Sequence, residues 1–96
     1  MDTKSEEFIN AAKKILIKCF QSKGAGEAAC LPEDDPGQWS PKSIMVLHIE
    51  GRIPDRFVFY QSEKYWTKAE EELSALLGKS VYFESINSAV YALYWG

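Results

Sequence analysis

The chain has 96 residues, of which 46% are hydrophobic and 26% are charged, and its formal net charge is −3. This length and balance predict one globular domain over residues 1–96 and exclude a disordered chain or two separate domains. The acidic balance argues against a nucleic-acid partner, which requires clustered Lys and Arg. No apolar run approaches the roughly eighteen residues that a membrane span needs.

The first segment predicts an amphipathic helix over about residues 4–22. Apolar residues recur there at helical spacing, with lysines between them. Thr3 stands three residues before Glu6, as in a capping box, and a Lys–Gly pair at 23–24 is typical of a helix end. The residues before this helix are polar and acidic, unlike a signal peptide, so we expect a cytoplasmic protein.

Residues 24–42 predict a long loop, because three prolines and a glycine between residues 31 and 41 prevent a continuous helix. Such loops are often functional in small domains. Glu33, Asp34 and Asp35 place three adjacent carboxylates in the loop, and Trp39 follows them. We expect these four residues to contact a basic partner. The acidic spacing matches no EF-hand, and no metal site is predicted.

The stretch 43–61 predicts the central β-hairpin of the domain. An apolar run at 44–49 and an aromatic run at 57–60 flank a segment that contains Gly51 and Pro54. Because the first run is apolar on nearly every residue, we expect its strand to be covered on both faces, in the middle of a sheet.

The remaining residues predict a second helix over about 68–77 and a second hairpin with strands near 80–84 and 89–95. Thr67 and Glu70 suggest another capping box, and Gly78 stands where the helix would end. The order α-β-β-α-β-β predicts an α+β two-layer sandwich. It combines a four-stranded, mostly antiparallel sheet with two helices on one face.

Aromatic residues make up 14% of the chain, more than so small a core can hide. Side-chain alternation along the strands sends several tyrosines, and His48, to the sheet face without helices. We expect this open face to bind a partner through aromatic side chains, together with the end of the last strand. The predicted contact residues there are Tyr60, Tyr82, Tyr94 and Trp95.

His48 is the single histidine, so a multi-histidine metal site is excluded. It has the chemistry of a general base that acts with a loop carboxylate or with the Cys30 thiol. The simpler interpretation is a half-buried residue hydrogen-bonded to a neighbour. Cys19 falls on the apolar stripe of the first helix, where a free cysteine behaves as a small apolar residue. Because two cysteines do not make a disulfide framework, we expect both Cys19 and Cys30 to remain thiols.

The leading hypothesis is a small acidic protein-binding module, of inhibitor or immunity type, that recognises a basic protein and is not an enzyme. No cofactor and no catalytic residue is predicted. We also consider a homodimer formed by the open sheet face or by edge pairing of the final strand. The alternatives are a small enzyme or ligand-binding protein that uses His48 with a carboxylate or Cys30, and a structural subunit of a larger assembly.

Overall fold

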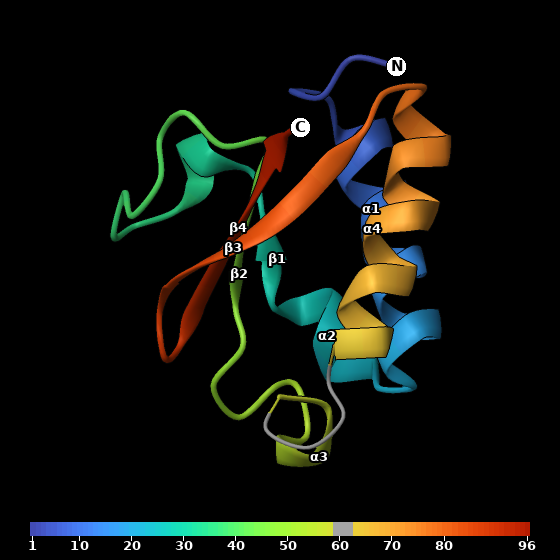
Figure 1. Cartoon of the computed structure of the whole chain (residues 1–96). Helices are drawn as coiled ribbons and strands as arrows, with labels where there is room; N and C mark the ends of the chain where they lie inside the picture. Colours follow the sequence, from blue (N-terminus) through green and yellow to red (C-terminus); the bar gives the residue numbers. More distant parts are fainter. Residues whose placement is uncertain (59–62) are drawn as a thin grey trace.

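Four strands form one antiparallel sheet in the order β1-β2-β4-β3 in the computed structural model, which describes residues 1–58 and 63–96 (Figure 1). The strands are β1 (Ala29–Cys30), β2 (Met45–His48), β3 (Val81–Asn87) and β4 (Val90–Trp95). The long helices α1 (Glu6–Phe20) and α4 (Glu63–Leu77) lie together on one face of this sheet. The predicted α+β class, with a four-stranded antiparallel sheet and helices on one face, is therefore confirmed.

Helix α1 lies within the predicted span of about residues 4–22, but both of its ends differ from the prediction. Its C-cap is Gln21, with φ 51, and the predicted end at Lys23 and Gly24 lies in the next helix. The N-cap is Ser5, whose hydroxyl accepts a hydrogen bond from the Phe8 N–H at 3.1 Å. The Ser5 N–H and hydroxyl both bond the Asp2 carbonyl, so a turn precedes the helix and Thr3 lies inside that turn. The capping box predicted at Thr3 is wrong, because the next hydroxyl along the chain has the capping geometry.

The central hairpin predicted over 43–61 is only half correct. Its first arm is β2, which is buried on both faces and lies inside the sheet, as expected. Where the second arm was predicted, the structure has a short helix, α3 (Asp55–Val58), and residues 59–62 lie outside the described residues. Pro54 precedes this helix and accepts a hydrogen bond from the Phe57 N–H, and proline is well suited to a helix start. Phe57 packs edge-on against Phe20 in the core.

The missing strand comes from the segment predicted as a loop. After the short helix α2 (Lys23–Glu27), the chain forms β1, which pairs antiparallel with β2 through Ala29 opposite Leu47 and Cys30 opposite Val46. Strand β4 occupies the other side of β2. The predicted element order α-β-β-α-β-β thus survives, with one strand drawn from a different stretch.

The C-terminal hairpin is confirmed as β3 and β4, but β4 is not an edge strand. It lies between β2 and β3, so the edge pairing predicted for the final strand is wrong. The edge strands are β1 and β3, and at the β3 edge side chains of α4 accept hydrogen bonds from two β3 amides. The Val81 N–H donates to the Ser74 hydroxyl at 3.0 Å, and the Phe83 N–H donates to the Glu70 carboxylate at 2.6 Å. Amides bonded in this way are not free to pair with another chain.

Helix α4 begins earlier than predicted, at Glu63, so the capping box proposed at Thr67 lies inside the helix and is also wrong. Its end agrees with the sequence: Gly78 has φ +72 and its N–H bonds the Ser74 carbonyl at 2.8 Å. None of the helices in residues 1–58 and 63–96 is long and apolar enough to cross a membrane.

The core lies between the two long helices and one face of the sheet. Its largest fully buried side chains on that side are Phe8, Leu16, Phe20, Met45, Leu47, Leu73 and Leu93. Trp66 of α4 joins the helices to the sheet, because its ring stacks on Tyr91 with centroids 4.3 Å apart and meets Phe20 edge-on at 4.8 Å. Aromatic pairs of this kind add to the energy of area burial.

Gly24 of α2 gives a direct test of how α2, and hence β1, is held in place. A Cβ at this position would stand well inside van der Waals contact of the Arg52 carbonyl oxygen, in the turn after β2. We expect Gly24→Ala to lower the free energy of unfolding by about 1–3 kcal/mol, because backbone atoms must separate. Urea unfolding measures the change.

The matched control is Gly26→Ala in the same helix. There the added methyl would meet the flexible end of Ile17 at 2.7 Å, which can rotate away. Equal losses of stability in the two variants would contradict the close approach of α2 to the turn.

Candidate functional site

The proline-rich segment 31–44 covers the sheet face that carries no helices. In Figure 1 this segment, with its single-turn helix η1 (Pro32–Asp34), lies on the side of the sheet opposite α1 and α4. Val46 and Ala92 point to this side and are completely buried, although neither belongs to the helix-side core. The face that was predicted to be open is therefore partly closed by the loop.

Asp35 anchors this loop through its carboxylate. Oδ1 accepts hydrogen bonds from the Gly37 N–H at 3.1 Å and from His48 Nε2 at 3.0 Å, and Oδ2 accepts from the Trp39 N–H at 3.0 Å. The side chain is 1% exposed. Two of the bonds shape the turn that contains Pro36 and Gly37, and the third ties this turn to β2.

A second attachment lies at the far end of the loop. The buried Ser40 hydroxyl hydrogen-bonds the Tyr94 hydroxyl of β4, and the Ser43 hydroxyl donates to the Ser40 carbonyl at 2.8 Å. Ser40 was not among the predicted site residues, because a single serine between Trp39 and a proline carries no distinctive pattern. With Asp35, it fixes the loop to both central strands.

The predicted contact residues separate into groups in the structure. Glu33, Asp34 and Trp39 are exposed on the loop, and Trp39 is 51% exposed. Tyr82 and Tyr94 face each other across β3 and β4, with ring centroids 5.8 Å apart, and Ser40 connects Tyr94 to the loop. We call these five residues (Glu33, Asp34, Trp39, Tyr82 and Tyr94) the acidic–aromatic surface.

Three predicted residues do not join this surface. Asp35 is turned inward and serves as the loop anchor. Trp95 alternates to the opposite side of β4, where Lys79 lies over its ring at 5.7 Å. Tyr60 lies outside the described residues.

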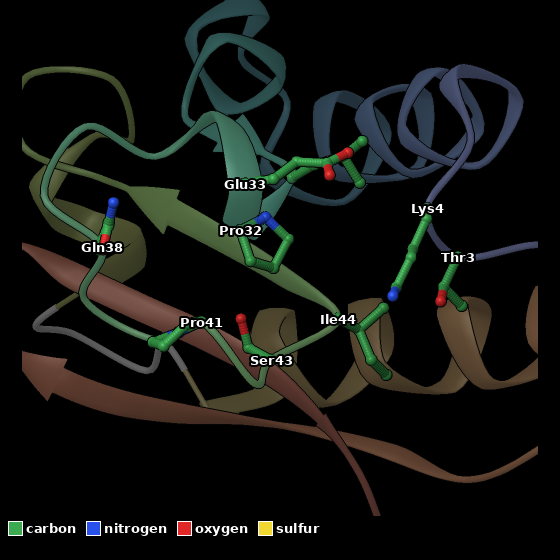
Figure 2. A pocket seen from close by; sticks show the side chains of 9 residues that line it. Thr3, Lys4, Pro32, Glu33, Gln38, Pro41, Ser43 and Ile44 are labelled. Atoms are coloured by element: carbon green, nitrogen blue, oxygen red, sulfur yellow. The ribbon is translucent and has the colours of Figure 1, made fainter.

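A cavity of about 460 Å³ opens between the loop and the N-terminal segment (Figure 2). Pro32, Pro41 and Ile44 form apolar parts of its wall, while Lys4 and Glu33 contribute opposite charges. Figure 2 shows these side chains around the hollow, with those of Thr3 and Lys4 coming from the segment before α1. This cavity could not be predicted from the sequence, because it depends on how the chain ahead of the first helix meets the loop.

Beneath the loop, the structure brings together the residues of the predicted alternative site. The Cys30 sulfur, a carboxylate oxygen of Asp35 and a ring nitrogen of His48 all lie within 4.8 Å of one another. His48 and Cys30 are partly exposed, whereas Asp35 is buried. Of the three loop carboxylates offered as a partner for His48, Asp35 is the one in contact.

Burial, hydrogen bonding and neighbouring charges shift the pKa values of Asp35 and Cys30 in this cluster. Burial by itself would raise the pKa of Asp35, but the bonds from Trp39, Gly37 and His48 outweigh it and hold that pKa below its ordinary value. Burial, together with the charges of Asp35 and Asp34, raises the pKa of the Cys30 thiol. This direction is opposite to the one that a thiolate nucleophile requires.

The second cysteine lies elsewhere and differs in its surroundings. Cys19 is buried in α1 and donates to the Glu72 carboxylate, which also pairs with Lys18. Burial, reinforced by Glu72, raises the pKa of the Cys19 thiol to about 12. The placement of Cys19 on the buried stripe of the first helix is confirmed.

Comparison of the chain with protein-family models, with curated proteins and with solved structures finds no significant match.

Asp35→Asn tests the loop anchor. The amide offers one acceptor oxygen in place of two and brings an N–H group toward backbone N–H donors, so we expect a loss of about 1–3 kcal/mol in unfolding free energy at neutral pH. Because the folded-state pKa of Asp35 is lowered, its contribution is complete above about pH 4 and is lost as the pH falls through the lowered pKa. Unfolding curves at several pH values should show the difference between wild type and variant shrinking in acid.

Asp34→Asn is the matched control, because Asp34 is the neighbouring exposed aspartate. It should change stability by no more than about 0.5 kcal/mol. A difference between wild type and Asp35→Asn that stayed constant down to the most acidic pH would contradict the assigned role of the carboxylate.

Proposed function

We propose that this protein is a binding module, of inhibitor or immunity type, that recognises a basic partner protein through the acidic–aromatic surface and acts by binding rather than catalysis. The observation that carries the proposal is the double attachment of the loop. Asp35 and Ser40 hold it to β2 and β4, while Glu33, Asp34 and Trp39 remain on the outside. We further propose that it acts in the cytoplasm, where both thiols stay reduced.

The attachment of the loop supports binding because a fixed loop has little conformational entropy left to lose. Ordering a mobile interface segment costs about 0.5–1.5 kcal/mol for each immobilised side chain. Here hydrogen bonds within the chain already hold the backbone on both sides of Trp39. A partner would meet a surface close to its bound conformation.

The exposed aromatic side chains support the same proposal. Trp39 is 51% exposed and Tyr82 is 42% exposed, and both lie on the loop side of the sheet. Tryptophan and tyrosine are enriched among the residues that dominate interface energies, because they bury a large area with few rotatable bonds.

Charge determines the kind of partner proposed. Glu33 and Asp34 stand side by side on the outer turn of the loop, in a chain whose net charge is −3. A complementary basic patch would speed association and select against acidic proteins.

The cavity beside the loop supplies a place for an anchor residue of the partner. Its wall combines apolar side chains with Glu33 and Lys4, so it suits a side chain that has an aliphatic stem and a polar end.

The proposal is tested by affinity capture from the lysate of the native organism with tagged protein. Wild type should recover one basic protein in stoichiometric amount at low salt and lose it as salt rises. The Glu33→Gln/Asp34→Asn double variant removes two exposed charges, so binding should weaken by about 2- to 30-fold, at 0.2–1 kcal/mol for each pair. Trp39→Ala should cost about 2 kcal/mol or more, as at an interface hot spot.

The matched control is Glu27→Gln/Glu50→Gln, which makes the same change in net charge at two exposed positions outside the loop. It should recover the partner as wild type does. Equal recovery by the loop variants and wild type would overturn the assignment of the binding surface.

A further inference from the structure

We propose that Cys30, Asp35 and His48 form a binding site for a zinc ion beneath the loop. This inference is independent of the proposed partner binding, since it concerns the inner side of the loop and involves no other protein. The observation behind it is that three possible ligand side chains meet at one place: Cys30 from β1, His48 from β2 and Asp35 from the loop.

Strand pairing places two of the ligands on the same face of the sheet. Cys30 of β1 stands opposite Val46 of β2, and His48 is two residues further along β2. Side chains two residues apart on a strand point to the same face, so the thiol and the imidazole are diagonal neighbours across β1 and β2. Asp35 contacts His48 from the loop, because the loop covers this face of the sheet (Figure 1).

The nitrogen–oxygen distance is close to the one that a tetrahedral ion imposes. With Zn–N and Zn–O bonds of about 2.0–2.1 Å, a nitrogen and an oxygen ligand lie about 3.3 Å apart, and His48 Nε2 and Asp35 Oδ1 are 3.0 Å apart. A sulfur ligand lies about 3.6 Å from its neighbours on the same basis. The Cys30 sulfur is within 4.8 Å of the other two ligand atoms, so a side-chain movement of about 1 Å completes the set.

The donor set favours zinc over hard cations. Thiolate, imidazole and carboxylate are the three ligand types that zinc accepts, whereas Mg²⁺ and Ca²⁺ prefer oxygen alone. Thiolate and carboxylate together carry two negative charges, which the ion neutralises. Asp34 adds a nearby negative charge, and Lys13 is the nearby cation on the Cys30 side.

The second sphere of the site is already formed. Asp35 keeps its bonds from the Gly37 and Trp39 N–H groups when the ion takes the place of the His48 proton, so the carboxylate stays oriented. The His48 side chain is 29% exposed, which gives the ion a route of entry and leaves the fourth position to a water molecule.

The test is a titration of the reduced, chelator-treated full chain with Co²⁺, followed by Zn²⁺. We expect one Co²⁺ per chain, with a thiolate-to-cobalt charge-transfer band and the visible absorption of a tetrahedral ion, both removed by Zn²⁺ and not by Mg²⁺. Cys30→Ser should abolish the charge-transfer band. His48→Gln should weaken binding by at least the roughly 10–100-fold that the loss of a second-sphere partner costs.

Cys19→Ser is the matched control, because it removes the other thiol and should leave the band unchanged. Absence of the band in the wild-type protein would overturn the proposal, as would a band that persists in Cys30→Ser or disappears in Cys19→Ser. Circular dichroism shows whether each variant folds. The wild-type titration tests the proposal even where a variant does not fold. Because the titration contains no partner protein, its failure leaves the proposed binding function untouched, and a failed affinity capture leaves the site untouched.

Discussion

The arrangement of the non-helical side of the molecule depends on one buried carboxylate. Burying Asp35 is costly by itself, and the structure compensates with two backbone N–H groups and the His48 ring. These bonds bend the loop at Pro36 and Gly37 and hold it on β2. Val46 and Ala92 are then buried on a second face, so a sheet with helices on one side has cover on both sides.

The same loop therefore has two sides with different tasks. Its inner side fills the sheet face with Asp35 and Ser40, while its outer side carries Glu33, Asp34 and Trp39. Three adjacent acidic residues look alike in the sequence, yet one is structural and two are free to meet solvent or a partner. The thiol of Cys30 and the imidazole of His48 lie beneath the loop and share Asp35 with this scaffold, so the proposed zinc site lies on the inner side of the loop and the proposed binding surface on its outer side.

Periodic features were predictable from the sequence, and features set by distant contacts were not. The spacing of apolar residues located α1, β2, α4 and the last hairpin. The aromatic run at 57–60 suggested a strand, but Phe57 is needed in the core against Phe20, and Pro54 favours a helix start. The two-residue strand β1 has no periodicity to detect. The pairing of His48 with a loop carboxylate was foreseen as an alternative, while the choice of Asp35 depends on a turn that only the fold defines.

Native-state hydrogen exchange of the Gly37 and Trp39 amides tests whether the Asp35 carboxylate holds the loop on β2. If the Asp35 carboxylate holds the loop, both N–H groups exchange much more slowly than an open chain, because exchange requires the loop to detach from β2. Protection that falls in Asp35→Asn and persists in Asp34→Asn would agree with this account. Exchange of both amides at the rate of an unstructured peptide in the wild-type protein would contradict it.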